Sequence, residues 1–249
     1  MFKSLCAAAV GLASIAFAPA AHAVPVDLEL QLLVDVSGSV NSNEFALQAQ
    51  GYADAFRTAE VQNAISNGQI GSIAVQLVFW SGASQQSVAI DWVQLSTASD
   101  ANSFADAILA AGRPFSGGTA IGNAIDFGVA QFANDFEGTR NVIDVSGDGT
   151  ANRARTAASR DAALAGGIDT INGIAIGSES VRQFYEDNVI GGIGAFVLLA
   201  STFEDFDAAI RQKLLVEITA GNEVPLPGAV LFLVTGAAGI ASLRRRAAA

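Results

Sequence analysis

The chain has 249 residues but only one cysteine, one histidine and one methionine, and these three are Cys6, His22 and Met1. Everything after residue 22 therefore lacks both a thiol and an imidazole. This absence excludes cysteine nucleophiles, Ser-His-Asp triads, histidine-ligated haem and ordinary zinc sites from that part of the chain. Any metal there must be held by oxygen atoms, which favours magnesium, calcium or manganese.

The N-terminal segment has little charge. Lys3 is its only charged side chain, and an apolar stretch follows from about Leu5 to Phe17. Ala21-His22-Ala23 then supplies the small-x-small pattern that precedes a signal-peptidase cut. Residues 1–23 are therefore predicted to be a secretory signal peptide that is cleaved after Ala23. A retained membrane anchor is the alternative, but the apolar stretch is short for a bilayer span.

The C-terminal segment, 222–249, contains a longer uncharged stretch. No charged side chain occurs from Val224 to Leu243, and Arg244–Arg246 follow directly. This length can span a bilayer, and the arginines would keep its C-terminal end in the cytoplasm; a buried terminal helix is the alternative. With its motif Val224-Pro225-Leu226-Pro227, the segment resembles the sorting signals of Gram-negative exosortase systems. The resemblance implies transient anchoring in the inner membrane, cutting by a sorting protease near the motif, and release to the cell surface or extracellular matrix.

Basic residues are scarce between these two segments. Residues 24–223, a range that includes Glu223 from the start of the C-terminal segment, hold nine basic and 24 acidic residues, a net charge of −15, because Lys3 and the three terminal arginines lie outside. Such an acidic surface excludes nucleic acid as an expected partner, since phosphate binding needs a basic face. Residues 24–221 have a length that suits one domain with a full hydrophobic core.

Apolar runs of strand length alternate with amphipathic stretches of helix length in this region. Strands that are apolar on both faces and alternate with helices are typical of a parallel sheet covered by helices. We therefore expect an α/β fold with a doubly wound, mostly parallel six-stranded sheet, helices on both faces and one antiparallel edge strand. The expected strands are 28–36, 71–80, 86–95, 140–147, 168–177 and 194–200, and the expected helices are 43–65, 98–112, 119–135, 155–167, 180–189 and 203–219.

Three polar loops follow strands or open helices at the edge where such sheets bind ligands. DVSGSV supplies Asp35, Ser37 and Ser39, GGTAIG supplies Thr119, and VSGDG supplies Asp148. Alternate positions in the first loop let both serine hydroxyls point to one place, and hydroxyl and carboxylate oxygens suit octahedral magnesium with water completing the shell. Only two negative charges would then face the ion, which leaves it electrophilic. Asp144, in the strand before Asp148, is the alternative ligand from the third loop.

Two other interpretations of the first loop fail on specific positions. A calcium loop of the EF-hand type starting at Asp35 would place Val40 where glycine is required and Ala46 where a glutamate closes the cage. A haloacid-dehalogenase-like phosphatase would need a second aspartate where Ser37 stands, as its proton donor, and a lysine in the middle of the chain. The only lysine after Lys3 comes much later in the sequence.

A structural interpretation stays open. In it, Ser37, Ser39 and Thr119 only cap helices, and Asp35 and Asp148 only form turns.

Asp-x-Ser-x-Ser with a distant threonine and a distant aspartate resembles the metal-ion-dependent adhesion site of the von Willebrand factor A domain. The phrases VDVSGSV, FWSGA, GGTAIG, VIDVSGDG and DNVIGGIGAF extend the resemblance, over nearly all of residues 24–221, to an exported bacterial family of uncharacterised function. It implies a von Willebrand A or Rossmann-like fold and a divalent cation, Mg²⁺ first, with Mn²⁺ or Ca²⁺ as alternatives. The implied ligands are Asp35, Ser37, Ser39, Thr119 and Asp148.

The expected function is that of an exported, metal-ion-dependent protein-binding module and not of an enzyme. In the family that it resembles, an acidic side chain of a protein partner takes the open position on the cation. Arg153 and Arg155 follow the third loop and are candidates for contacting that acidic partner, or form a solvated helix start. The alternatives are a structural envelope or extracellular-matrix protein with a purely structural metal site, and a metal-dependent hydrolase or phosphatase.

Overall fold

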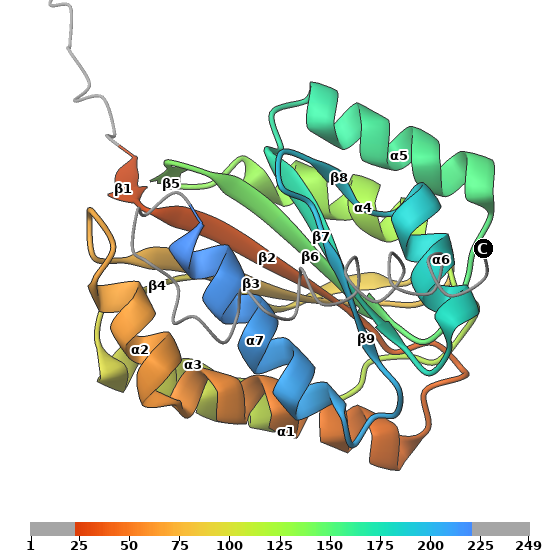
Figure 1. Cartoon of the computed structure of the whole chain (residues 1–249), viewed down its shortest axis with the longest axis horizontal. Helices are drawn as coiled ribbons and strands as arrows, with labels where there is room; N and C mark the ends of the chain where they lie inside the picture. Colours follow the sequence, from red (N-terminus) through yellow and green to blue (C-terminus); the bar gives the residue numbers. More distant parts are fainter. Residues whose placement is uncertain (1–22, 221–249) are drawn as a thin grey trace, which may run out of the picture.

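The computed structural model describes residues 23–220, and its centre is a seven-stranded sheet (Figure 1). Along the sheet the order is β4-β3-β2-β6-β7-β8, and β9 also pairs with β7. All pairs are parallel except β3 with β4 and β7 with β8. The strands are β2 (Leu28–Asp35), β3 (Ile73–Trp80), β4 (Gln86–Leu95), β6 (Asn141–Gly147), β7 (Thr170–Ile176), β8 (Gly191–Gly192) and β9 (Val197–Ala200).

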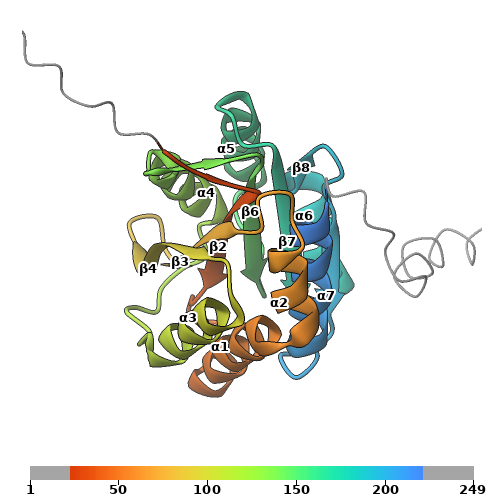
Figure 2. The ribbon, with the colours of Figure 1, turned by 90° about the vertical axis from the view of Figure 1, so that its left-hand side faces the viewer.

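Helices cover both faces of this sheet (Figures 1 and 2). Two buried clusters, one on each face, contain the apolar side chains of the covering helices. On one face lie α1 (Ser42–Arg57), α2 (Ala59–Ser66), α3 (Ala98–Ala110) and α7 (Phe206–Thr219). On the other lie α4 (Ile121–Val129) with the short 3-10 helix η1 (Ala130–Phe132), α5 (Arg153–Ala165) and α6 (Glu179–Asn188). The predicted doubly wound α/β fold is thereby confirmed.

The central strand β2 shows why this sequence forms a two-sided core. All of its residues are buried, and its side chains alternate between the two faces. Leu30 and Leu32 belong to the cluster under α1 and α7, whereas Leu33 belongs to the cluster under α4 and α5. Each fully buried leucine contributes about 1.5–3 kcal/mol through the hydrophobic effect. A strand that is apolar on both sides is stable only between two layers of helices.

A single helix was expected at 43–65, but the structure has two helices there, α1 and α2. Thr58 has an extended backbone between α1 and α2. Its hydroxyl donates to the carbonyl of Ala55 at 2.7 Å and accepts from the amide of Val61 at 3.3 Å. Thr58 therefore satisfies groups of both helices and fixes the bend between them, as threonine does at helix N-termini.

The sheet also has one more strand than expected. All six expected strands are present, and Gly191–Gly192, which lies outside the expected strands and helices, forms the two-residue strand β8 against β7. A separate two-stranded sheet pairs β1 (Val24–Val26) with β5 (Phe136–Gly138). Glycine pairs and three-residue strands carry no apolar periodicity, so neither element could be predicted from the sequence.

Among residues 23–220, no helix has both the length and the apolar character that a membrane crossing requires. The predicted C-terminal span and sorting motif lie outside the described residues, as does the predicted signal peptide apart from Ala23.

Candidate metal site

The first loop begins where β2 ends, at the edge toward which the parallel strands run. Asp35 and Ser37 are both fully buried, while Ser39 is exposed. The amide of Ser37 donates to Asp35 Oδ1 at 2.7 Å, and the hydroxyl oxygens of Ser37 and Ser39 lie 3.1 Å apart. The loop therefore turns one carboxylate and two hydroxyls toward the same place.

The third loop meets the first because β2 and β6 are parallel neighbours, so that their carboxyl ends coincide. Asp148 follows directly after β6, and its Oδ1 accepts a 2.7 Å hydrogen bond from the hydroxyl of Ser39. Asp148 is half-buried at the rim of the sheet.

The second loop lies beside the other two and carries Thr119. It is joined to the first loop by a 2.8 Å hydrogen bond from the amide of Gly38 to the carbonyl of Gly117. Thr119 is half-buried next to the third loop, since a Cβ atom built on Gly149 would lie 3.5 Å from Thr119 Oγ1. Ser81 holds this loop from below, accepting from the amide of Gly117 at 2.7 Å. The fold thus brings together the five side chains that the sequence pattern singled out.

One carboxylate oxygen of this group has no protein partner. Asp35 Oδ2 is buried and makes no hydrogen bond with any described residue, and the same holds for the hydroxyl of Tyr185. Both atoms border Gly147, where a Cβ atom would lie 2.7 Å from Tyr185 Oη and 2.8 Å from Asp35 Oδ2. A buried carboxylate oxygen without a partner costs free energy that a bound cation would recover. The donor set of carboxylates and hydroxyls therefore fits a hard divalent cation.

Burial raises the pKa of Asp35 to about 7, and the nearby charge of Asp148 adds to this shift, against hydrogen bonds from Ser37 and a smaller backbone contribution from Asp148 that lower it. The shift has the direction expected for a carboxylate held in a dry site without its counter-ion. A divalent cation at this position would favour the ionised form.

The capping interpretation of these residues does not match the helix ends. The N-cap of α1 is Asn41, whose side chain accepts from the amides of Asn43 and Glu44, and Glu44 bonds back to the amide of Asn41. The N-cap of α4 is Ala120, which makes no side-chain capping bond. The hydroxyls of the first two loops therefore cap neither helix.

Asp144, the alternative ligand, faces away from the loops. It is fully buried in β6, and its Oδ1 lies 2.7 Å from Lys213 Nζ on α7.

Sequence reasoning missed Arg113, which lies in the segment between α3 and α4. Its Nη2 donates to the carbonyls of Val36 at 2.8 Å and Ser37 at 2.6 Å, and its Nε donates to Phe115 at 3.2 Å. Arg113 thus holds the backbone of the first loop from behind. A lone arginine in an irregular segment carries no pattern that could have identified it.

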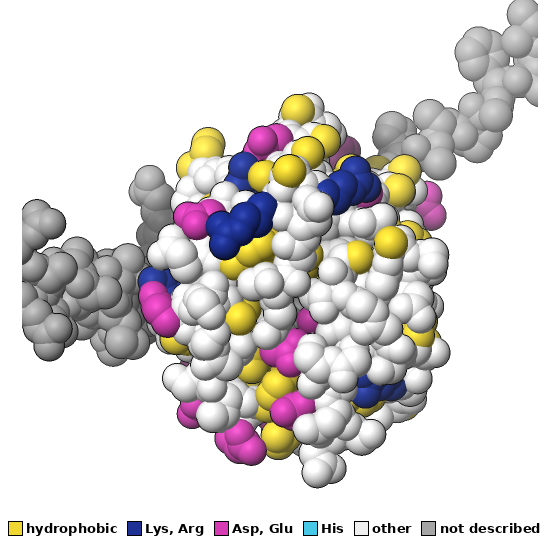
Figure 3. All heavy atoms as spheres, turned by 90° about the vertical axis from the view of Figure 1, so that its right-hand side faces the viewer, with side chains coloured by type: hydrophobic (Ala, Val, Ile, Leu, Met, Phe, Trp, Pro, Cys, Tyr) yellow, Lys and Arg dark blue, Asp and Glu magenta, His cyan; other side chains and the backbone are white. Residues whose placement is uncertain are grey.

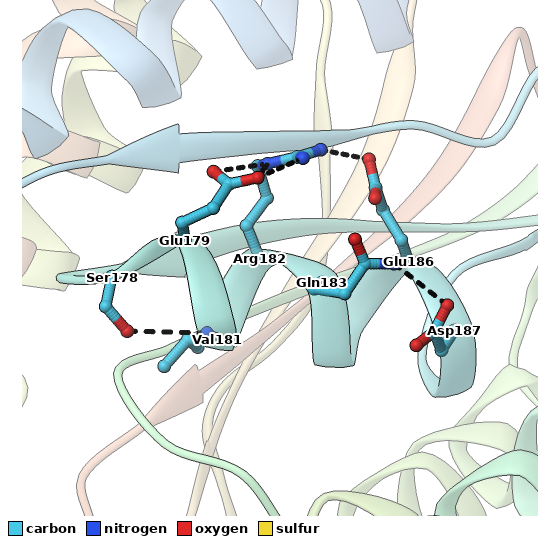
Figure 4. A network of polar contacts seen from close by, with 7 residues as sticks. All are labelled: Ser178, Glu179, Val181, Arg182, Gln183, Glu186 and Asp187. Atoms are coloured by element: carbon cyan, nitrogen blue, oxygen red, sulfur yellow. Dashed lines mark hydrogen bonds and ion pairs between the residues drawn. The ribbon is translucent and has the colours of Figure 1, made fainter.

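Tyr185 was not predicted from the sequence either. It lies on α6, whose outer side carries several side-chain pairs. Figure 4 shows Arg182 of α6 between Glu179 and Glu186, with Gln183 donating to Asp187. These pairs lie at the surface of the helix, where solvent screens them, so each contributes little to stability. They stabilise α6 while its inner side places Tyr185 beside Gly147.

The two arginines after the third loop are exposed and engaged within the chain. Arg155 pairs with Asp126 of α4, and the Arg153 guanidinium lies over the ring of Phe184, 5.8 Å from its centroid. Contact with a partner stays a prediction for both.

A groove of about 470 Å³ opens beside Asp148. Its walls come from Glu44 of α1, from 176–178 and from 201–204. Figure 3 shows the molecule from the side toward which the parallel strands run; acidic side chains are spread over this face, including its centre, and basic ones gather mainly in its upper part. Within residues 23–220 no three His, Cys, Asp or Glu side chains cluster as a metal site, so the candidate site depends on hydroxyl oxygens as well as on its two carboxylates.

Several solved structures share this fold. The pilus adhesin SpaC of Lactobacillus rhamnosus GG superposes with a TM-score of 0.60 at 17% identity, over 79% of this chain and 31% of that one. Proximal thread matrix protein 1 of the mussel byssus, described with a zinc-occupied MIDAS motif, superposes with a TM-score of 0.58 at 19% identity, over 79% of this chain and 49% of that one. A von Willebrand factor type A protein of Catenulispora acidiphila superposes with a TM-score of 0.54 at 13% identity, over 78% of this chain and 43% of that one. The chain thus spans from about a third to a half of each of these proteins, and at such identities the likeness establishes a von Willebrand A-type fold.

No curated protein matches the sequence. One family model does, over residues 25–222, and its description is "Protein of unknown function (DUF1194)". The chain belongs to this family, DUF1194, and has the fold of von Willebrand A domains.

Proposed function

We propose that this protein is an exported, metal-ion-dependent protein-binding module that holds a divalent cation with Asp35, Ser37, Ser39, Thr119 and Asp148. The observation that carries the proposal is the buried Asp35 Oδ2, which has no partner among the described residues and belongs to the loop in which the hydroxyls of Ser37 and Ser39 lie 3.1 Å apart and Ser39 bonds to Asp148. A buried carboxylate oxygen without a partner is costly, and a bound cation would remove that cost.

The oxygen-only donor set supports magnesium first, with manganese and calcium as alternatives. When bound, the cation would act as a Lewis acid for an incoming anionic oxygen. Asp35 and Asp148 are the only charged residues in the set, so a doubly charged ion would keep its affinity for such a group. Arg113 and Tyr185 would position the set from behind without being ligands.

The proposed partner is a protein that offers an aspartate or glutamate side chain to the cation. Ser39 is exposed and Asp148 borders the groove, so an approaching carboxylate has access from solvent. Arg153 and Arg155 lie on the exposed start of α5, directly after the third loop, and are the proposed secondary contacts for an acidic partner.

A role in binding is favoured over hydrolysis by the side chains around the site. Both carboxylates of the set are proposed as ligands, and Glu44, which lines the groove, already accepts a 2.7 Å hydrogen bond from the amide of Asn41. The described residues contain no histidine to serve as a general base.

Export, and the anchoring and release that the C-terminal motif implies, belong to the same proposal. The proposed organisation is a signal peptide at 1–23, the binding domain at 24–221 and a sorting segment at 222–249. Export would place the metal site at the cell surface or in the extracellular matrix.

The test is thermal melting of the metal-stripped protein during titration with magnesium, manganese, calcium and zinc; zinc is included because of the mussel protein. Saturable stabilisation is expected, because a ligand that binds only the folded state raises stability. Asp148→Asn should abolish it, and Asp161→Asn, an exposed carboxylate of α5 that lies outside the set, should retain it. Equal responses in the two variants would refute the site. A glutamate-containing peptide competing for the loaded protein would then separate a binding module from a structural metal site.

A further inference from the structure

A second group of reactive side chains lies in the core, away from the candidate metal site. Lys213, the only lysine among the described residues, is fully buried on α7. Its Nζ lies 2.7 Å from Asp144 Oδ1 on β6 and contacts Glu217 Oε1 one turn further along α7. Asp144 is also fully buried and Glu217 is 2% exposed. An amine and two carboxyl groups are thus enclosed together without water access.

This arrangement is not electrically neutral. With all three groups ionised, this group would carry one excess negative charge in the interior, which is costly. The half-buried Arg140, whose Nη2 donates to the carbonyl of Glu217 at 2.6 Å, offsets part of this charge. Burial accordingly raises the pKa of Asp144, while the charge of Lys213 opposes the shift. A protonated Asp144 beside a lysine and an ionised Glu217 removes the excess charge. Such a carboxylic acid is a better acceptor for an amine than a carboxylate is.

The immediate surroundings leave the carboxyl group of Asp144 open to attack. Its Oδ1 is in contact with the Lys213 amine, while its Oδ2 has no hydrogen-bond partner among the described residues. Glu217, by contrast, is fixed by Asn172, whose Nδ2 donates to Glu217 Oε1 at 2.8 Å. The ring of Phe196 lies 5.7 Å from Lys213 Nζ and adds to the apolar wall. Two reacting groups held in contact in a dry site gain the large advantage of an intramolecular reaction.

We propose that Lys213 and Asp144 join through an intramolecular amide bond, with Glu217 as the group that transfers the proton. The Lys213 ammonium gives a proton to Glu217, and the neutral Nζ attacks Cγ of the protonated Asp144 carboxyl group. The new C–N bond forms and one C–O bond breaks. The leaving hydroxyl takes the proton back from Glu217 and departs as water. The nitrogen then passes its surplus proton to Glu217, which ends protonated beside the new amide. The step consumes no oxidant, reductant or cofactor, because an acid and an amine become an amide and water.

The bond would join two elements that matter for the rest of the molecule. Asp144 lies on β6, the strand that leads to Asp148, and α7 is the last described helix before the C-terminal segment. Residues 23–220 contain no cysteine, so a disulfide cannot provide such a link. An amide between β6 and α7 would keep α7 on the sheet when force acts on the C-terminal end.

The experiment is peptide mapping by mass spectrometry of the purified, denatured protein after trypsin digestion. Trypsin cuts after Arg140, Arg153 and Arg211 but not after an acylated lysine. The expected product joins peptide 141–153 to the peptide that begins at Gln212, and its mass is that of the two peptides minus one water. Fragmentation should place the junction at Asp144 and Lys213.

Two variants separate the chemistry from the fold. Glu217→Gln keeps the acceptor for Asn172 but cannot take the proton, so it should fold, by circular dichroism, and give the unlinked peptides. Lys213→Arg should likewise give no joined product. Unlinked peptides from folded wild-type protein would overturn the proposal and leave the group as a buried ion pair. A joined product in Glu217→Gln would overturn the assigned role of Glu217.

Discussion

Ser39 donates a 2.7 Å hydrogen bond to Asp148 although 109 residues separate them in the chain. The bond joins the loop after β2 to the loop after β6, two strands that run parallel side by side. It places a hydroxyl and a carboxylate where the buried Asp35 has an oxygen without a partner. This contact supports the proposed cation site, and it can be tested directly.

Ser39→Ala should leave the fold intact and remove most of the response to cations. One exposed hydrogen bond is worth about 1 kcal/mol, whereas a cation at about 100 times its Kd stabilises the folded state by about 2.7 kcal/mol. The measurement is the shift of the melting temperature on adding magnesium. Ser99→Ala, at an exposed serine on α3, is the matched control and should behave as wild type. A full magnesium response in Ser39→Ala would argue against Ser39 as a ligand.

Gly147→Ala should destabilise the protein by about 1–3 kcal/mol through overpacking. The added Cβ atom would meet Tyr185 Oη at 2.7 Å and Asp35 Oδ2 at 2.8 Å. Chemical denaturation gives the free energy of unfolding, and the double variant with Tyr185→Phe should recover part of the loss because it removes one of the two close atoms. Gly112→Ala, where a Cβ atom would meet nothing within 4 Å, should be tolerated.

Arg113→Met should weaken cation binding without removing any proposed ligand. The arginine donates to the carbonyls of Val36 and Ser37, so its loss frees the backbone that places the first loop. Hydrogen bonds from a charged donor contribute about 1.5–3 kcal/mol each, and part of this loss should appear as a higher cation concentration at half-saturation. Arg211→Met, at an exposed arginine on α7, is the control. If Arg113→Met melts earlier yet keeps the wild-type half-saturation, Arg113 stabilises the fold only.

Asp100→Asn should reduce the loss of stability in acid. Hydrogen bonds from Ser96, and then from Thr97, lower the pKa of Asp100 at the start of α3. A carboxyl group whose pKa is lower in the folded state than in the unfolded chain stabilises the protein when the pH is above its unfolded-state pKa, which is about 3.9. This contribution is lost as the pH falls through its folded-state pKa. Melting temperatures of the variant and the wild type should therefore differ at neutral pH and converge toward low pH. A difference that is constant across this range would contradict the assignment.

The sequence alone determined the fold class and the five residues of the candidate site. Strands such as 28–36 are apolar on both faces and alternate with helices, and this local pattern permits little besides a covered parallel sheet. Because carboxyl ends of parallel strands share one edge, the positions of Asp35 at the end of its strand and of Asp148 just after its strand already implied that they meet.

Only the tertiary structure decided what each neighbouring residue does. Asp144 and Asp148 are four positions apart, yet Asp144 lies in the core against Lys213 and Asp148 lies at the rim against Ser39. Arg113 supports the first loop from a segment without regular structure. These partners come from distant parts of the chain, and side-chain pairing across such distances depends on which elements pack together. Periodicity along one strand or helix carries no record of that packing.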